Sequence, residues 1–269
     1  MPSTSPTSRC SCDSTMPSAT SSAWARSTTP AGRGEGPAMS NLWRGHLEGM
    51  PHDPPHDPGG QVVVLSAHPD DEVLAVGGWL AGQTDRDVVF VTATDGEASH
   101  PGSPSITPDE LRARRPGELV EALRRLGFVA PDVRRLGLPD GGLERHRDDL
   151  RGLVEPLLRE ASLVLAPFAH DGHPDHEALG RAVLDAVPAS AVVWQMPIWT
   201  WAWTEPDEQP WRPSLRRLEC TSPGRHRKRR AMAAFETQVK PLSDHPADLA
   251  VVDEALARHA AYAPEAVIV

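Results

Sequence analysis

The chain has 269 residues, with 27 lysine and arginine side chains against 37 aspartate and glutamate side chains, so its formal net charge is −10. This acidic balance argues against a general nucleic-acid-binding protein, which needs a basic surface. No stretch reaches the roughly 18 consecutive apolar residues of a membrane helix, so no membrane insertion is expected. Three cysteines are too few to build a disulfide scaffold, and the absence of a Cys-x-x-Cys pair argues against a thiolate zinc finger.

The first part of the chain lacks hydrophobic periodicity. Residues 1–40 alternate Ser and Thr with Pro, Ala and Gly, and residues 52–60 are rich in turn formers. Such a composition buries too little apolar surface to offset the entropy cost of ordering. We therefore predict a disordered tail over residues 1–60 and a single domain over residues 61–269, with residues 1–38 either a dispensable tail or an over-extended start. The tail has no apolar region of a signal peptide, and we expect a cytoplasmic location.

Short apolar runs alternate with helical patterns from residue 62 onward. The β-branched run 62–65 suits a strand buried on both faces of a parallel sheet. Thr107, Pro108 and Glu110 have the pattern of a capped helix start, and Pro116 predicts a kink or break in that helix. Further predicted strands are 88–91, 132–136, 163–165 and 191–194. One further helix is predicted to begin at residue 73, and others to span residues 148–161, 176–186, 225–239 and 247–261. This alternation indicates an α/β fold with a mostly parallel sheet flanked by helices.

Two clusters of histidine and aspartate follow predicted strands. The sequence HPDD at 68–71 follows the first strand, and HPDH at 173–176 follows a later one. In open α/β sheets the functional crevice lies beyond the carboxyl ends of the strands, so we expect the two clusters to meet there. Imidazole and carboxylate groups bind zinc and similar ions, and a hydrolytic site keeps three protein ligands and a water. The predicted ligands are His68, Asp71 and His176.

The remaining side chains of the two clusters suit acid–base chemistry. Asp70 stands beside the predicted metal-bound water, whose proton it can accept. His173, facing from the other cluster as a positively charged group, can stabilise the oxyanion and protonate the leaving amine, while Asp175 orients it. The alternative is that Asp70, Asp71 or Asp175 merely caps a helix. Two clusters of the same pattern, each after an apolar strand, favour the metal site.

The sequence AHPDDE at 67–72, taken with HPDH at 173–176, resembles the PIG-L/LmbE-like family of metal-dependent de-N-acetylases. Segments in the same order as in that family are residues 94–98, Arg115 with Glu118, 136–141, 228–231 and 237–238. The resemblance spans roughly residue 62 to the C-terminus. It implies a Rossmann-like three-layer α/β fold, one bound Zn²⁺ (with Fe²⁺, Co²⁺ or Mn²⁺ as alternatives), and hydrolysis of N-acetyl groups, mostly on N-acetylglucosamine-containing substrates.

The resemblance also implies roles for individual residues. His68, Asp71 and His176 match the metal ligands, Asp70 the general base, His173 the general acid and oxyanion stabiliser, and Asp175 the residue that tunes His173. Arg115 and Asp140 match positions that face the sugar. The sequence departs from the family at Pro116, where a helix former is usual, and at Thr237, where serine is usual. Both departures leave the predicted metal site intact.

Two further segments stand out. Residues 194–211 hold five of the eight tryptophans, and within 199–203 the tryptophans alternate with period two. If that stretch is extended, one face of it is exposed, so we predict that Trp201 and Trp203 form part of a substrate-binding wall or of an interface in a homo-oligomer. The basic run 225–230 is interpreted as a solvated helix start rather than a patch for an anionic ligand.

These observations lead to one favoured function and several alternatives. The favoured function is a zinc-dependent hydrolase that removes the N-acetyl group from a small amino-sugar-containing substrate. The same site would also suit an amidase acting on a thiol conjugate or a natural-product amide. A divalent-metal phosphoesterase would need extra carboxylates bridging two ions. A non-catalytic metal-binding or carbohydrate-binding module would lack Asp70 or His173, and both are present.

Overall fold

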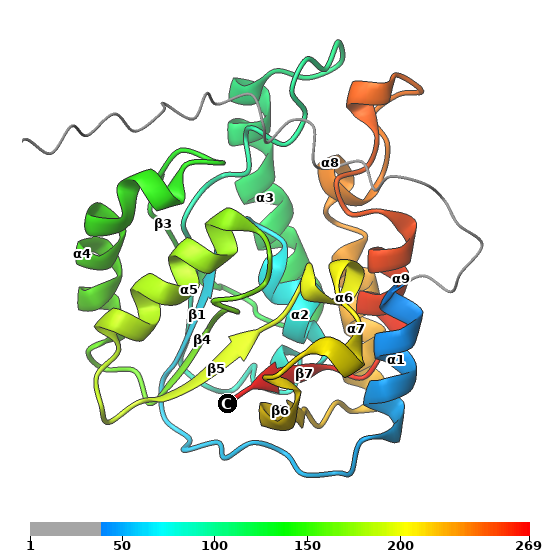
Figure 1. Ribbon diagram of the computed structural model, residues 1–269. Coiled ribbons are helices and arrows are strands. Elements are labelled where there is room, and N and C mark those ends of the chain that lie inside the picture. The colour runs from blue at the N-terminus through cyan, green and yellow to red at the C-terminus, as the bar shows by residue number, and fades with distance from the viewer. Residues whose placement is uncertain (1–38) are drawn as a thin grey trace, which may run out of the picture. The chain divides into compact units, whose positions relative to one another are not determined.

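The computed structural model describes residues 39–269, whose strands form one seven-stranded sheet (Figure 1). Its order is β3-β2-β1-β4-β5-β7-β6. The first five strands are parallel, and β7 is antiparallel to both β5 and β6. The strands are β1 (Val62–Ser66), β2 (Val88–Thr92), β3 (Asp132–Arg135), β4 (Leu163–Pro167), β5 (Val192–Met196), β6 (Leu215–Arg217) and β7 (Ala266–Ile268). The predicted α/β fold with a mostly parallel sheet is therefore confirmed.

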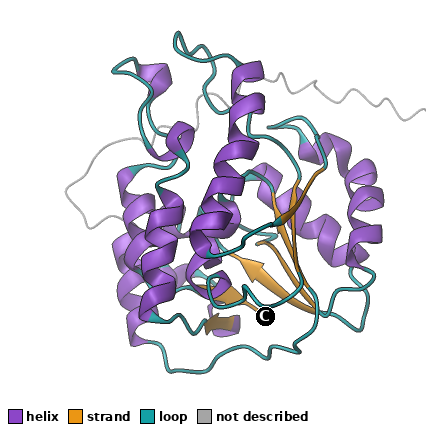
Figure 2. Ribbon diagram, turned by 180° about the vertical axis from the view of Figure 1, so that it is seen from behind, coloured by secondary structure: helices purple, strands orange, loops and turns teal. Residues whose placement is uncertain are grey.

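Helices cover both faces of the sheet and bury two hydrophobic cores (Figure 2). Val62 and Val64 of β1 belong to the core beneath one helical layer, whereas Val63 belongs to the core beneath the other. Alternate side chains of a strand point to opposite faces, so a strand covered on both sides is apolar throughout. One layer contains α2 (Asp71–Leu80), α3 (Pro108–Leu126), α7 (Ser222–Met232) and α9 (Glu254–Tyr262), and the other contains α4 (Arg147–Leu158) and α5 (Pro174–Ala186).

Helix α3 begins as the sequence predicts but does not break where expected. The Thr107 side chain accepts the Glu110 N–H, and the Glu110 side chain accepts the Thr107 N–H, which completes a capping box. The helix then continues through Pro116 to its end, so the predicted break is wrong. Buried leucines on both sides of the proline, Leu111 and Leu119 among them, hold the helix against the core. This packing outweighs the one backbone hydrogen bond that proline removes.

The prediction of disorder up to residue 60 is wrong for helix α1 (Met39–Gly49). Trp43 and Leu47 lie four residues apart on one helical face, and both are fully buried. The Trp43 Nε1–H donates to the Thr204 carbonyl oxygen at 2.8 Å. The helix was not predicted because Pro and Gly residues lie on both sides of this short apolar face in the sequence. The prediction for residues 1–38 lies outside the described residues.

The last third of the chain is divided into more elements than predicted. The single helix predicted over residues 225–239 is two helices, α7 and the short α8 (Glu236–Val239). The tryptophan-rich segment contains the short helix α6 (Thr200–Trp203). Single 3₁₀ turns are η2 (Leu143–His146), η3 (Pro206–Glu208), η4 (Arg212–Ser214) and η5 (Pro246–Asp248). Across residues 39–269, no helix combines the length and apolar character that a membrane crossing requires.

Candidate metal centre

The strand order places the two histidine clusters at one crevice. The chain moves outward from β1 to β3 and then returns to the other side of β1 as β4. The carboxyl ends of β1 and β4 therefore flank the point where the strand order reverses, which is where open α/β sheets bind ligands. His68 follows β1, and His176 lies in the first turn of α5 after β4. Their ring centroids lie 5.3 Å apart, so the structure brings the clusters together.

Three donor atoms converge in this crevice. His68 Nδ1 lies 3.2 Å from His176 Nε2, and His176 Nε2 lies 3.3 Å from Asp71 Oδ1. The distance from His68 Nδ1 to Asp71 Oδ2 is 3.8 Å. Two imidazole nitrogens and one carboxylate are a donor set that zinc and similar divalent ions prefer, and their spacing allows one ion to contact all three.

Each histidine is oriented from behind by a carboxylate. His176 Nδ1 lies 2.8 Å from Asp171 Oδ2, and His68 Nε2 lies 3.1 Å from Asp140 Oδ1. A metal-ligating histidine almost always donates its other ring N–H to such a partner, which sets the tautomer and the ring orientation. With a cation in place of ring protons, His68 Nδ1 and His176 Nε2 would face the common point as its ligand atoms, so the residues present fit a divalent ion.

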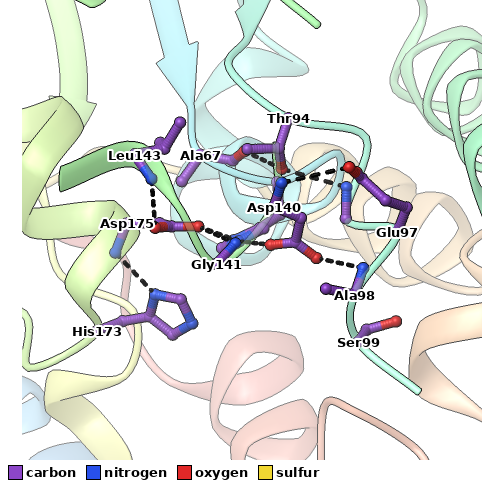
Figure 3. A network of polar contacts seen from close by, with 12 residues as sticks. Ala67, Thr94, Glu97, Ala98, Ser99, Asp140, Gly141, Leu143, His173 and Asp175 are labelled. Carbon is purple, nitrogen blue, oxygen red and sulfur yellow. Dashed lines mark hydrogen bonds and ion pairs between the residues drawn. The ribbon is translucent and has the colours of Figure 1, made fainter. Parts of the chain in front are cut away.

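A second group of possible ligands shares His68 and adds Asp140 and Asp175. It contains one imidazole, and both of its carboxylates already receive backbone N–H groups (Figure 3). These N–H donors are Ala98 to Asp140 at 2.8 Å, and Gly141 and Leu143 to Asp175 at 2.7 and 3.1 Å. We therefore favour the group formed by His68, Asp71 and His176.

Asp71 and the two histidines stabilise each other's charged forms. Burial raises the pKa of Asp71, but His176 and His68 outweigh it and lower the pKa to about 2. Burial lowers the pKa of His176, but Asp71 and Asp171 raise it to about 9. Burial also lowers the pKa of His68, but Asp140, followed by Asp175 and Asp71, raises it well above the ordinary value. The carboxylates around the two rings thus favour positive charge at this point, which a bound cation would supply.

Asp70 occupies the N-cap position of α2, yet its side chain makes no capping hydrogen bond there. The alternative interpretation of Asp70 as a helix cap is therefore wrong. Its side chain is buried, and burial together with repulsion from Asp71 raises its pKa to about 7. A carboxylate with a pKa near neutrality is suited to accept and release a proton.

His173 caps helix α5 in place of an aspartate, since its Nδ1 accepts the Asp175 backbone N–H at 3.3 Å. Burial, followed by repulsion from His176 and His68, lowers the pKa of His173 to about 2. This environment favours the neutral ring, and a positively charged His173 during the reaction stays a prediction. Because Nδ1 is an acceptor, the ring proton lies on Nε2.

The two residues predicted to face a sugar make contacts inside the protein. Arg115 is almost fully buried and donates to the Gly96 carbonyl oxygen at 2.7 Å and to Ser99 Oγ at 2.9 Å. Gly96 has φ of +68°, and a Cβ there would lie 1.9 Å from the guanidinium. Asp140 accepts from His68 and from Ala98, as described above. Arg115 thus shapes the loop after β2, and Asp140 orients a metal ligand.

The tryptophans 199–203 do not form an extended strip, because α6 makes this stretch helical. In a helix, residues four apart share a face, so Trp199 and Trp203 stack on each other with ring centroids 4.8 Å apart. Trp201 points the other way and is 6% exposed, in contact with Trp43 and His259. The expectation that Trp201 and Trp203 share an exposed face is wrong. Trp203 is 48% exposed.

Sequence reasoning missed two residues beside the site. Asp171 accepts the backbone N–H groups of Ile198, Trp199 and Thr200 in addition to contacting His176. Its position in the loop between β4 and the HPDH sequence was the available signal. Lys228 lies in the run interpreted as solvated, yet it is 2% exposed. The available signal was the segment 228–231, which stands in the same order as in the resembling family.

Comparison with known proteins identifies the family. The family model of PIG-L, described as GlcNAc-PI de-N-acetylase, matches residues 63–187. These residues form a PIG-L family domain. The match includes both histidine clusters and excludes α1, the tryptophan-rich segment and α7. The Rossmann-like character expected from the resemblance agrees with this assignment.

Curated relatives carry names of de-N-acetylases. A probable N-acetyl-alpha-D-glucosaminyl L-malate deacetylase 2 of Bacillus subtilis (strain 168) is 35% identical over 134 residues, covering 47% of this chain and 60% of the relative. A 1D-myo-inositol 2-acetamido-2-deoxy-alpha-D-glucopyranoside deacetylase 2 of Saccharopolyspora erythraea is 32% identical over 159 residues, covering 48% and 57%. The matched part of the chain thus spans somewhat more than half the length of these relatives.

Solved structures share the PIG-L fold. The A40926 pseudoaglycone deacetylase Dbv21 is 26% identical with a TM-score of 0.52, covering 79% of this chain and 97% of that chain. The N,N'-diacetylchitobiose deacetylase of Pyrococcus horikoshii has a TM-score of 0.54 at 22% identity, covering 72% and 76%. At that identity, the second likeness supports the fold alone.

Proposed function

We propose that this protein is a metal-dependent hydrolase that removes the N-acetyl group from a small amino-sugar-containing substrate. The observation that carries the proposal is the convergence of His68 Nδ1, His176 Nε2 and the Asp71 carboxylate beside the buried Asp70. The PIG-L domain and the names of its curated relatives support the choice of an N-acetyl amide as the bond that is cleaved.

His68, Asp71 and His176 would hold the ion, which we propose to be Zn²⁺. When bound, such an ion supplies Lewis acidity that polarises an amide carbonyl and acidifies a water. Asp70 then accepts the proton of the attacking water, a task that its buried carboxylate suits. Asp70 stands between the proposed ligands His68 and Asp71 in the chain. The charges of Asp71 and of both histidines act on its carboxylate, so we expect it next to the reacting centre.

His173 acts from the other wall of the crevice. Its Nε2–H donates a hydrogen bond to the oxygen on which negative charge develops, and the ring stays in this tautomer because Nδ1 accepts the Asp175 N–H. To protonate the leaving amine as well, the ring must first become an imidazolium, with Nδ1 exchanging its hydrogen bond for a proton, and the proton that Asp70 takes from the water balances the one that His173 gives up. Asp175 contributes by holding Gly141 and Leu143 and by fixing the first turn of α5.

The predicted substrate residues would act in two different ways. Arg115 and Asp140 would act on the substrate through the loop after β2 and through His68, whereas Trp203 has an exposed ring. A direct sugar contact of Arg115 or Asp140 stays a prediction, as do a cytoplasmic location and a homo-oligomer. We expect the acyl group to enter at the metal centre and the sugar to extend outward from it.

The test combines metal analysis with an amine-release assay on a panel of N-acetyl amino sugars. We expect about one equivalent of divalent metal, loss of metal in His68→Ala, and amine release by the wild-type protein. Release of phosphate from ester substrates with no amine release would replace the proposal with a phosphoesterase. Stoichiometric metal with neither activity would favour a non-catalytic module.

A further inference from the structure

Two stacked tryptophan rings form a platform next to the metal centre, which we name the Trp199/Trp203 platform. We propose that it binds a second ring of the substrate, joined to the N-acylated amino sugar, so that the enzyme prefers glycosides over free monosaccharides. This inference rests on the proposed function and names the substrate class of the same site. The second ring can be a sugar or an aryl group, because both offer a flat apolar face.

The platform is continuous with the proposed acid. Trp199 lies over His173 with ring centroids 6.2 Å apart and planes inclined by 22°. Trp203 stacks on Trp199 at 4.8 Å and 18°. His173, Trp199 and Trp203 therefore form a continuous stack that begins at the metal centre, and its last ring, Trp203, is 48% exposed. If the amide of a substrate lies at His173, the group attached to its amino sugar can lie against this stack.

The backbone next to His173 is shaped to receive Trp203. Gly172 has φ of +87°, and a Cβ at that position would lie 3.1 Å from Trp203 Cε3. The Trp203 ring therefore lies against the peptide that immediately precedes His173. A side chain at residue 172 would push the ring away, and the positive φ also disfavours any residue other than glycine there.

The platform is held rigidly from behind, so its exposure is built into the fold. The Asp171 carboxylate accepts three consecutive backbone N–H groups, from Ile198 to Thr200, at the start of α6. On the opposite side of α6, Trp201 packs against the fully buried Trp43 at 4.9 Å. A rigid aromatic surface costs little entropy when it binds, and this favours it as a recognition element.

The chemistry of the platform selects its ligand. Indole rings offer a large apolar face with a negative quadrupole, which attracts the C–H edge of a sugar ring or the face of an aryl group. The acetyl group and the first sugar occupy the crevice at the metal centre, so the second ring is the part that reaches Trp203. The platform lies outside the segment 63–187 that the family model matches.

Steady-state kinetics on three substrates tests the inference. The substrates are N-acetylglucosamine, N,N'-diacetylchitobiose and p-nitrophenyl N-acetyl-β-D-glucosaminide. For Trp203→Ala we expect KM to rise roughly tenfold on a two-ring substrate with kcat unchanged, and a much smaller rise in KM on the monosaccharide. Trp203→Phe should restore most of the loss. Tyr262→Ala removes another exposed aromatic side chain, on α9, and is the matched control.

Equilibrium binding separates this inference from the proposed function. Calorimetric titration of the p-nitrophenyl glycoside and of the disaccharide into each metal-loaded variant gives Kd values whether or not turnover occurs. Weaker binding of either ligand to Trp203→Ala, with wild-type affinity in Tyr262→Ala, supports the platform even if no amine is released. Loss for the disaccharide alone assigns sugar stacking, and loss for the aryl glycoside alone assigns aryl stacking. Equal Kd values in wild type and Trp203→Ala, no binding to the wild type, or a changed oligomeric state with unchanged Kd would overturn it.

Discussion

The PIG-L domain at residues 63–187 and the segments that flank it contribute to the site in different ways. Within the domain, His68 and His176 lie in or just after loops that directly follow strands, so the sheet itself positions them. The flanking segments act by reaching back to these loops. Gln238, for example, donates from its Nε2 to the Pro69 carbonyl oxygen at 3.0 Å. The domain thus supplies the reactive groups, and the flanks hold their backbone in place.

A buried ion pair shows how a flanking segment does this. Helix α2, which begins with the ligand Asp71, is interrupted at Val76, where φ is −130° and ψ is 20°. Lys228 Nζ donates to the Leu74 carbonyl oxygen at 2.8 Å, before the break, and also pairs with Glu265 at 2.8 Å. The Glu265 carboxylate accepts the N–H groups that follow the break, those of Gly78 at 2.6 Å and Trp79 at 2.9 Å. The Lys228 ammonium therefore lies at the carboxyl end of the first half of α2, and the Glu265 carboxylate lies at the amino end of the second half, where each charge is favoured by the helix dipole.

The largest expected effect lies inside the PIG-L domain. Asp70→Asn keeps the shape of the side chain but removes the base, so we expect kcat on a substrate of the wild-type enzyme to fall about 10³-fold. Metal content measured by atomic emission should stay at the wild-type value. Full activity in Asp70→Asn would mean that another group accepts the proton.

The next effect tests the flanking segments through the ion pair. Lys228→Met leaves the Glu265 charge buried without its partner, and we expect the free energy of unfolding to fall by about 4 kcal/mol. Urea denaturation measures this change. The double variant Lys228→Met with Glu265→Gln should recover part of the loss, and Arg230→Met, at an exposed position of the same helix, should change little. A loss below about 1 kcal/mol in the single variant would contradict a structural role for the pair.

Asp171 belongs to the domain but joins both regions, since it contacts His176 and the start of α6. Asp171→Asn weakens the acceptor for the His176 ring N–H, so we expect affinity for the divalent ion to fall about 10- to 100-fold. Competition with a chelator measures this affinity. Asp185→Asn, on the exposed side of α5, is the control. If metal affinity is unchanged, orientation by Asp171 does not contribute to metal binding.

The smallest effect concerns α1. Trp43→Phe removes the N–H donated to the Thr204 carbonyl oxygen, and we expect the free energy of unfolding to fall by about 1 kcal/mol. Thermal and urea unfolding measure it, with the partly exposed Leu42→Ala as the control. Turnover of a monosaccharide substrate should not change. A large loss of such turnover would show that α1 positions the reactive groups as well as the tryptophan segment.

Much of the central sheet was predictable because its signals are local. The run 62–65 is apolar at every position, as required of a strand covered on both faces, and Thr107 with Glu110 announces a helix start within four residues. The metal-ligand candidates were predictable for the same reason, since each follows such a strand. Trp201 was not, because a period-two pattern of tryptophans does not distinguish a strand from a short helix. Helix α1 was not predicted because its short apolar face is stabilised only by contacts with α6 and α9, which lie far away in the sequence.

By itself the sequence determined the α/β class and the two histidine clusters, because short apolar runs and polar loop motifs depend on near neighbours in the chain. Only the tertiary structure decided which groups orient the ligands. Asp140 is 72 residues from His68, and Lys228 is 154 residues from the carbonyl group of Leu74 that it binds. It also decided that Trp203 is exposed beside His173 while Trp201 is buried. These properties arise when distant segments pack together and exclude water, and no pattern of neighbouring residues encodes them.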